Sequence, residues 1–307
     1  MWWRRADGVL ARNVPNTRRV MPYLMRGRNE SAVYFGFECN LQKTDGFVRA
    51  WNQTNPTRRI DVFHVSVWAL CDALKRNPTV HRFVAGGRLY DRHGVWFSYV
   101  VKTRLETGAP FVVVKRRFDL DESFGAMVDG MQAEQAKATS AELSTVDREL
   151  GLLLKFPGFI RRIFMAIVRG VDNVGMLPRS FIEKDPMYTS AFFANMASFG
   201  MPAVYHHLYE YGTAAIFCSV GRPQVVPGSP QTGPDRRRTM NLKFTFDERA
   251  EDGLAAWLTI RKIKQILEDP EGSGIVVEDR ATDAVTAVKS SLDSPVTSVA
   301  AAVDSSP

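Results

Sequence analysis

The chain has 307 residues and a mass of 34.5 kDa, enough to bury a large core in one domain or two small ones. Hydrophobic residues make up 45% and charged residues 24%, and the net charge of +7 is scattered over the whole chain, which disfavours nucleic acid as a partner. No apolar run reaches the roughly 18 residues of a membrane span, and the basic start MWWRRADGVL lacks the apolar stretch of a signal peptide.

The three cysteines, Cys39, Cys71 and Cys218, lie far apart in the sequence without a CxxC spacing. This pattern predicts neither a disulfide framework nor a zinc site. Among the histidines only His206 and His207 are close, and sequence neighbours rarely share one metal, so we predict no bound metal. Free cysteines that behave as small buried residues fit a reducing, cytoplasmic location.

The first half of the chain alternates helices and strands without a strict pattern. We expect residues 1–17 to form a loose basic arm, and AVYFGFECNL, residues 32–41, to form a strand. Residues 61–78 predict a buried helix, because apolar side chains cover most of its surface and Asn77-Pro78 ends it. The turn residues of Asp91–Gly94, between two aromatic and β-branched runs, predict a hairpin.

Residues 141–185 predict a helical insertion. Its apolar residues recur at helical spacing, with arginines between them: Phe159, Ile160, Ile163, Phe164, Ile167, Val168 and Val171 against Arg161, Arg162 and Arg169. We favour a core helix with a solvated basic edge. The alternative is a helix that lies on an anionic membrane, which predicts an exposed apolar face over Phe159–Val171.

The second half returns to strands. YTSAFFANMASFG (188–200), GTAAIFCSVGRP (212–223) and TMNLKFTFDE (239–248) each contain an apolar or alternating strand, and residues 254–270 predict a last helix that Pro270 ends. Residues 271–307 are small and polar, and we expect a disordered tail. No GxGxxG or Walker-type motif supports a nucleotide-binding fold.

The segment TFDERAEDG, residues 245–253, places five charged residues between the alternating strand and the last helix. In this order the block resembles the end of the catalytic domain of the 2-oxoacid dehydrogenase acyltransferases, the dihydrolipoyl acyltransferase family, which is related in fold to chloramphenicol acetyltransferase. The family carries Asp-His-Arg-x-x-Asp-Gly here. Asp247, Arg249, Asp252 and Gly253 match this pattern, and Glu248 holds the position of the catalytic histidine.

A second stretch, FFANMASFG, is similar to the family's Ser-Asn-x-Gly-x-x-Gly, with Asn195 and Gly200 kept and Ala194 at the serine position. The apolar strand in GTAAIFCSVG and the basic-rich start RRVMPYLMRGRNESAVYF also agree in order. The resemblance covers about residues 18–270. It implies an α/β fold: a single chloramphenicol acetyltransferase-like domain with a mixed β-sheet flanked by helices.

What the resemblance implies chemically is transfer of an acyl group between coenzyme A and a thiol. The histidine is the general base, the serine hydroxyl steadies the oxyanion, and the motif's aspartate pairs with an arginine to shape the loop. The site lies in a channel between subunits of a trimer. By this analogy we assign Glu248, Arg249 and Asp252 to the catalytic site, and Asn195, Ser198 and Gly200 to binding of coenzyme A.

Three interpretations of the changed motif stay open. Glu248 is the base, which requires an environment that favours a neutral carboxyl, since a carboxylate ordinarily titrates about two to three pH units below an imidazole. Alternatively the base is His206 or His207, although paired histidines are more often structural. In the third interpretation the fold is catalytically inactive and acts as a scaffold or binding partner. The loss of the oxyanion donor, with Ala194, weighs against ordinary turnover.

The partners follow from the same resemblance. We expect acyl-CoA as a substrate and a homotrimer or higher homo-oligomer. No lipoyl-bearing domain precedes Arg18, so we expect no covalent lipoyl group on this chain. The acceptor is then a small thiol or hydroxyl compound, or the lipoyl group of another protein. The scattered arginines suit the phosphates of coenzyme A.

Overall fold

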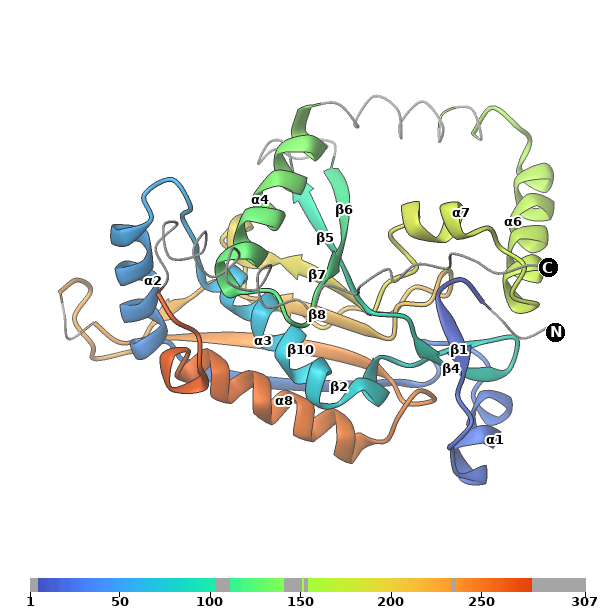
Figure 1. The fold of residues 1–307 in the computed structure, drawn as a ribbon, viewed down its shortest axis with the longest axis horizontal. Coiled ribbons are helices and arrows are strands. Elements are labelled where there is room, and N and C mark those ends of the chain that lie inside the picture. The colour runs from blue at the N-terminus through green and yellow to red at the C-terminus, as the bar shows by residue number, and fades with distance from the viewer. Residues whose placement is uncertain (1–4, 103–110, 141–150, 152–153, 234–235, 278–307) are drawn as a thin grey trace, which may run out of the picture.

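The structure, a computed structural model, describes residues 5–102, 111–140, 151, 154–233 and 236–277. Its main feature is a seven-stranded sheet with the order β2-β10-β8-β7-β5-β6 and a short β9 paired with β10 (Figure 1). These strands are β2 (Ala32–Asn40), β5 (Val95–Lys102), β6 (Phe111–Phe118), β7 (Ala191–Asn195), β8 (Ile216–Val220), β9 (Gln224–Val225) and β10 (Arg238–Asp247). A smaller sheet has the order β1-β4-β3, from β1 (Gly8–Leu10), β3 (Phe83–Ala85) and β4 (Arg88–Arg92).

The main sheet is mixed. Strand β7 runs parallel to both of its neighbours, β5 and β8, whereas β2, β6 and β9 pair antiparallel with their neighbours. Strand β10 pairs antiparallel with both β2 and β8. The α/β class and the mixed sheet that the sequence predicts are therefore confirmed.

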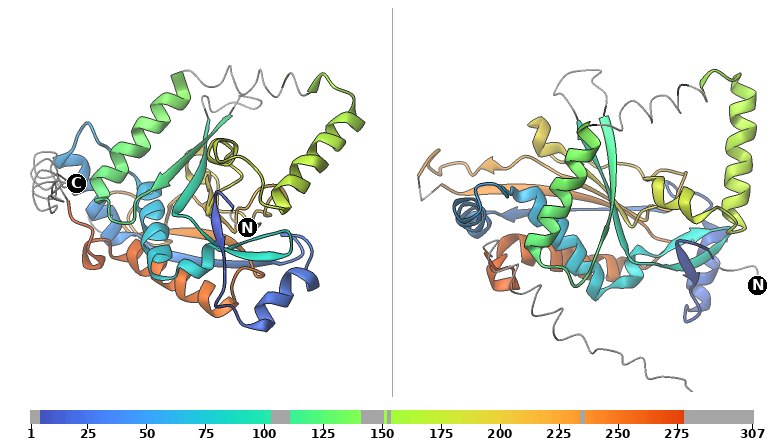
Figure 2. Two further views of the ribbon diagram at one scale, coloured as in Figure 1. Left: turned by 45° about the vertical axis from the view of Figure 1, so that its right-hand side comes forward. Right: turned by 45° about the horizontal axis from the view of Figure 1, so that its top comes forward.

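Helices cover one face of this sheet and bury the main core against it (Figures 1 and 2). They are α2 (Gln42–Thr54), α3 (Val62–Arg76), α4 (Phe124–Ser140) and α8 (Gly253–Glu268). As the alternation of β10 predicts, Met240, Leu242, Phe244 and Phe246 are all buried on this side. The part of the chain that the structure describes also contains α1 (Asn16–Leu24), α6 (Gly158–Asn173) and α7 (Arg179–Lys184).

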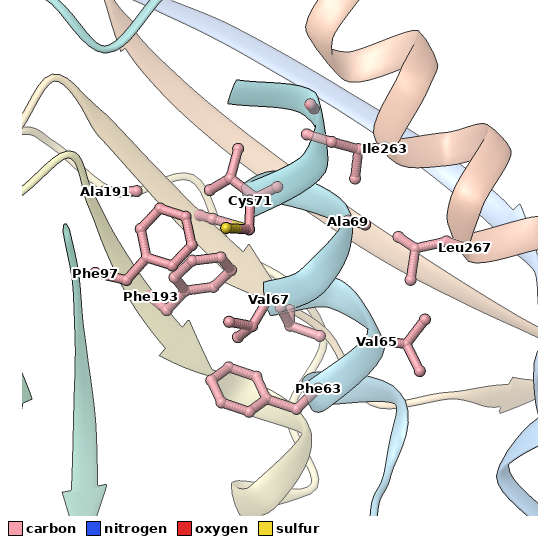
Figure 3. Packing of buried hydrophobic residues seen from close by; sticks show 14 of the residues in the cluster. Phe63, Val65, Val67, Ala69, Cys71, Phe97, Ala191, Phe193, Ile263 and Leu267 are labelled. Carbon is pink, nitrogen blue, oxygen red and sulfur yellow. The ribbon is translucent and has the colours of Figure 1, made fainter. Parts of the chain in front are cut away.

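Helix α3 lies at the centre of the core, as its apolar sequence predicts. It begins at a capping box, in which the Asp61 carboxylate accepts from the backbone N–H groups of Phe63 and His64 and the ring of His64 bonds back to the backbone of Asp61. Figure 3 shows Phe63, Val67 and Cys71 of α3 beside Phe97 and Phe193 of the sheet, and Val65 and Ala69 toward Leu267 and Ile263 of α8. All the side chains named in this figure are buried, so α3 joins the sheet to α8.

The opposite face of the sheet is covered by the loop that precedes β8. Leu208 of this loop packs with Phe192 of β7 and Phe217 of β8 in a separate buried cluster. The loop is tied down at its end, because the Glu210 carboxylate accepts from the backbone N–H groups of Arg28 and Asn29. It therefore lies against the side of β10 that carries Thr245, whose hydroxyl donates to the carbonyl of His206 at 2.5 Å.

Two sequence predictions are wrong in this region. Residues 8–10 are not part of a loose arm, because they form β1 against β4, and Arg5 is buried. The hairpin turn is not at Asp91–Gly94, since β4 and β5 belong to different sheets. The hairpin connects β3 and β4 through Gly86 and Gly87, whose φ angles of 54° and 73° suit a tight turn of glycines.

Packing also extends past Pro270, where the sequence analysis places the start of the tail. Ile275 is buried in the main core and Val277 packs against it. Residues 278–307, the rest of the predicted tail, lie outside the described residues, as do residues 141–150 of the predicted insertion. The described part of the insertion is helical, with α6 and α7.

Helix α6 is not the core helix that the sequence analysis favours, because it contains no buried residue. It stands apart from the helices on the sheet, at the edge of the molecule (Figures 1 and 2). Five of its large apolar side chains are exposed: Phe159 at 64%, Ile160 at 38%, Ile163 at 57%, Phe164 at 46% and Ile167 at 59%. The exposed face is the outcome that the alternative, membrane-surface interpretation predicts.

Candidate active site

The DERAEDG loop is held by a buried ion pair at the end of β10. The Asp247 carboxylate accepts from Nε of Arg249 at 2.9 Å and from Nη2 of the same guanidinium at 2.8 Å. The hydroxyl of Ser31 also donates to Asp247, at 2.9 Å. Arg249 in turn donates to the carbonyl of Arg26 at 3.0 Å. Both charged side chains are nearly excluded from solvent, so the pair fixes the start of the loop to the end of α1 and to β2.

Glu248 is positioned through its backbone. Its N–H donates to the carbonyl of Ser31 at 2.9 Å, and its carbonyl accepts from Nη1 of Arg18 at 2.8 Å. The side chain is half-buried, and its carboxylate makes no hydrogen bond or ion pair with any residue that the structure describes. The Glu248 carboxylate therefore does not contribute to the stability of the loop.

The other acids of the motif are compensated locally. Asp252 caps α8, with its carboxylate accepting from the backbone N–H of Ala255 at 2.9 Å, and lies 3.9 Å from Nη2 of Arg18. Glu251 pairs with Arg82 at 3.3 Å. Since Asp247 is also paired, the three acids next to Glu248 in the motif each lie beside an arginine that balances their charge.

His206 and His207 lie on the loop over the opposite face of the sheet. The ring of His206 stacks on Phe217, with centroids 4.0 Å apart, and its Nδ1 lies 2.7 Å from the carbonyl of His207. Because a carbonyl only accepts, Nδ1 carries the proton and Nε2 is left as the acceptor. Burial lowers the pKa of His206, which keeps it neutral at pH 7. His207 is exposed.

The small-residue motif forms a turn at the end of β7. The Asn195 side chain accepts from the backbone N–H of Ser198 at 3.3 Å, the Ser198 hydroxyl donates to the Asn195 carbonyl at 2.7 Å, and Gly200 has a φ of 68°. All three residues therefore have a local structural role. Ala194, on β7 just before them, offers no hydrogen-bond donor in its side chain.

Within one chain, the small-residue motif at the end of β7 lies far from Glu248 of the DERAEDG loop. The strand register places Ala194 opposite Ser219 on β8, and Ser219 opposite Lys243 on β10. Lys243 precedes Glu248 by five residues, which is about 16 Å along a strand, with two strand spacings of about 5 Å to cross as well. His206, bonded to Thr245, is nearer to Glu248 along β10 than the Asn195 turn is.

A basic pocket of about 490 Å³ adjoins the motif loop. It combines arginines from three separate parts of the chain, Arg26 and Arg28, Arg169 of α6, and Arg249, and these outnumber the two acids of the lining, Asp172 and Glu210. Arg28 is 6% exposed, and its Nε atom has no hydrogen-bond partner among the described residues. Burial lowers the pKa of Arg28, the expected effect of removing a cation from water without a directly bonded carboxylate. The pocket suits an anion, and the scattered arginines of the sequence did not reveal it.

A second basic cavity, of about 520 Å³, lies beside the first. Among its lining residues Arg5 pairs with Asp7, and Arg179 pairs with Glu183, so the acids of this cavity are neutralised. Lys115 also lines it. Its ammonium donates to the backbone carbonyls of Ile182 and Asp185, and burial lowers its pKa to about 8. The ion pair of Arg5 with Asp172, at 2.6 Å, stands between the two cavities, since Arg5 lines the second and Asp172 lines the first.

Exposed apolar side chains flank the motif loop on both sides. The set comprises Val20, Tyr23 and Leu24 of α1 and Leu254, Trp257 and Leu258 of α8. Arg18, which contacts both the Glu248 carbonyl and Asp252, joins the two helices at the loop. Several exposed apolar side chains on both sides of a polar loop are typical of a protein–protein interface.

Comparison with known proteins identifies the fold. No protein-family model matches the sequence, and no curated protein matches it. Among solved structures, a probable dihydrolipoamide acetyltransferase from Listeria monocytogenes is similar with a TM-score of 0.53 over 87% of this chain and 98% of that chain, at 14% identity. The cubic core of the pyruvate dehydrogenase multienzyme complex is similar with a TM-score of 0.55 over 86% and 93%, at 14% identity.

A third similar structure is the dihydrolipoamide acetyltransferase of Azotobacter vinelandii, with a TM-score of 0.54 over 86% and 93% of the two chains, at 14% identity. The chain has the fold of a dihydrolipoamide acetyltransferase core. At this identity the likeness concerns the fold alone. The Azotobacter structure belongs to a study of a serine, a histidine and an asparagine in that enzyme's catalytic mechanism. Glu248 and Ala194 stand where the motif resemblance places a histidine and a serine in this chain.

Proposed function

We propose that this protein is an acyltransferase that moves an acyl group between coenzyme A and a thiol or hydroxyl acceptor, with Glu248 as the general base. The observation that carries the proposal is the motif loop. Asp247, Arg249, Ser31 and the Asp252 cap hold the loop by themselves, which leaves the carboxylate of Glu248 free for a proton. This arrangement stands on a fold shared with acetyltransferase cores.

In the proposed reaction Glu248 takes the proton of the acceptor, and the resulting thiolate or alkoxide attacks the thioester carbonyl of acyl-CoA. The carbon–sulfur bond to coenzyme A then breaks, and the departing thiolate recovers the proton from Glu248. The products are the acylated acceptor and free coenzyme A. Since Ala194 provides no donor for the oxyanion, we expect turnover about 10²–10³-fold below that of an enzyme with one.

Two features support coenzyme A as a partner. The pocket beside the loop offers Arg26, Arg28 and Arg169, and charge-assisted bonds from arginine suit phosphates. The second basic cavity lies on the other side of the Arg5–Asp172 pair and offers Lys115 and Arg117 as further cations. The same pockets would accept other polyanions. Comparison of the affinities for coenzyme A and for ATP tests whether binding is specific for coenzyme A.

A homotrimer or higher homo-oligomer is part of the proposal. Within one chain the Asn195 turn and Glu248 lie far apart, so a second copy has to bring them together. The apolar surface of α1 and α8 around the loop offers the contact. Closure by a second copy would also remove water from the loop, and burial favours the neutral form of a carboxyl, as a base for a thiol requires.

The experiment measures release of free coenzyme A from acetyl-CoA and longer acyl-CoAs, with dihydrolipoamide and a pool of small thiols and alcohols as acceptors. Glu248→Gln should abolish turnover and leave the affinity for coenzyme A unchanged. Glu271→Gln, which changes an exposed carboxylate in the short 3-10 helix Glu271–Ser273 after α8, is the matched control and should behave as wild type. Arg26→Ala with Arg169→Ala should weaken coenzyme A binding about tenfold or more.

Other results decide between the remaining interpretations. If His206→Ala or His207→Ala loses turnover while Glu248→Gln stays active, the general base is that histidine on the loop before β8. Binding of coenzyme A without any turnover would favour the second candidate function, a scaffold or binding protein. That candidate rests on the combination of Ala194 with an intact loop that needs no catalytic group for its stability. Absence of both binding and turnover would refute the acyltransferase proposal.

A further inference from the structure

Helix α6 carries most of its large apolar residues on the side that faces away from the protein. The half-buried residues of α6 are Arg161, Met165, Val168, Val171 and Asp172. Four of them, Arg161, Met165, Val168 and Asp172, are spaced by four, three and four residues and define one stripe along the helix. This stripe is the side turned toward the rest of the chain. A surface helix normally turns its apolar side inward, so the amphipathicity of α6 is inverted.

The outward side forms a second stripe, at the same helical spacing. It comprises Phe159, Ile160, Ile163, Phe164 and Ile167, all exposed, and the exposed Leu154 and Phe156 lie just before the helix. Ile163, in the middle of this stripe, is 57% exposed. Monomeric proteins rarely leave so many large apolar side chains together in water, so a further partner covers this face.

The charges beside the stripe are positive. Arg162 and Arg169 are exposed on the flank of the helix, and Lys155 is exposed just before it. The one acid between Leu154 and Asn173 is Asp172, which is occupied by Arg5 at 2.6 Å on the inward side. The outward surface of α6 is therefore apolar and cationic, which is complementary to anionic lipid head groups above an acyl layer.

We propose that α6 binds the surface of an anionic lipid membrane, with Phe159, Ile163 and Ile167 inserted among the head groups. The helix lies on the membrane and does not cross it, because its 16 residues span only about 24 Å along the axis. No helix within the described part of the chain is long and apolar enough to cross a bilayer.

A second copy of this chain is a poorer occupant for the same face. A symmetric contact between two α6 helices would place the Arg162 and Arg169 rows of both copies near one another, and the outward side offers no acid to compensate them. A membrane with anionic lipids supplies that compensation.

The helix is fixed to the body at its C-terminal end, so membrane binding would orient the whole domain. Arg5 donates to the carboxylate and the carbonyl of Asp172, and the Asn173 side chain accepts from the backbone N–H of Gly86 at 3.2 Å. Arg169 also lines the basic pocket beside the motif loop. The membrane-binding face and that pocket therefore adjoin, although the inference does not depend on the proposed reaction.

Cosedimentation of the full chain with vesicles tests the proposal. Wild type should bind phosphatidylcholine vesicles that contain phosphatidylserine far better than phosphatidylcholine alone. Ile163→Glu with Ile167→Glu should weaken binding at least about 50-fold, because two apolar contacts are lost and two like charges meet the surface. Arg162→Gln should weaken binding to anionic vesicles about fivefold. Val276→Glu, the same change at a side chain 61% exposed elsewhere, is the control and should bind within about twofold of wild type.

An environment-sensitive dye on Ile163→Cys locates the contact. Selective labelling is feasible because Cys39, Cys71 and Cys218 are buried, and burial raises the pKa of Cys39 and of Cys71 to about 12. The dye at position 163 should shift to shorter wavelength on anionic vesicles, and the same dye on Val276→Cys should not. Failure of wild type to bind anionic vesicles, or equal binding of the double glutamate variant, would overturn the proposal. So would a fall in the oligomeric mass of that variant in solution, since it would assign the face to a second copy.

Discussion

Replacement of Asp247 by asparagine tests the ion pair on which the motif loop depends. Asp247 and Arg249 are 3% and 4% exposed, and the carboxylate accepts bonds from the Ser31 hydroxyl and from three N–H groups of Arg249. Asparagine keeps the volume but removes the charge and one acceptor oxygen. Loss of one partner of a buried pair costs about 3–5 kcal/mol, because the other charge stays buried. Arg249 keeps the Arg26 carbonyl, so we expect about 3 kcal/mol.

Urea unfolding at pH 7 measures this change, with a fall in melting temperature of about 6–12 °C as a second readout. The control is Asp121→Asn, which removes a pair with Lys75 that is shorter, at 2.6 Å against 2.8 Å, but lies on a side chain 86% exposed. An exposed pair contributes about 0–1 kcal/mol. Equal losses in the two variants, or a loss below about 1 kcal/mol for Asp247→Asn, would refute the assignment of loop stability to this pair.

The other predictions concern the acid response and the anchor of α6. The pKa of His81 is lowered to about 3 by burial and by the charges of Arg92 and Arg82. Between about pH 3 and pH 6.5 the unfolded chain therefore binds a proton that the folded chain does not, and stability falls as the pH drops through this window. Between pH 7 and pH 5 we expect the free energy of unfolding, measured in urea, to fall by about 2 kcal/mol because of His81. His81→Gln should lack this fall, and the same pH dependence of stability in that variant would contradict the assignment. Gly86→Ala should loosen α6, because its φ is 54° and the new Cβ would lie 2.2 Å from the carbonyl oxygen of Asn173. The control is Gly228→Ala, because the φ of Gly228 is also positive but the space at its Cβ position is open. Faster hydrogen exchange of α6 in Gly86→Ala than in Gly228→Ala would confirm the steric cause.

Much of the fold could be predicted from the sequence wherever one local pattern has one structural solution. The alternation of Met240, Leu242, Phe244 and Phe246 requires a strand with one buried face. The Asp-Gly at the end of the motif predicts a helix start, and Asp252 caps α8. The motif order along the chain then led to an α/β fold with a mixed sheet.

The features that sequence reasoning missed depend on contacts between distant segments. An amphipathic helix has the same period whether its apolar side faces inward or outward, so Phe159–Ile167 could not decide between core and membrane surface. Strand β1 is three residues long and exists because β4 offers an edge. The basic pocket gathers arginines separated by more than 200 positions, a proximity that no local pattern encodes.

A substitution at position 248 can change proton transfer without changing the structure of the loop. Because the loop is held by the backbone of Glu248, by the Asp247–Arg249 pair and by the Asp252 cap, its shape places no demand on the side chain at 248. A scaffold would accept any residue there of suitable size, whereas an acyltransferase requires a group that exchanges protons. Glu248→Ala should therefore leave the unfolding free energy within about 0.5 kcal/mol of wild type. Loss of acyl transfer in such a stable variant would show that the carboxylate acts on substrate, and retained transfer would assign the proton to another group.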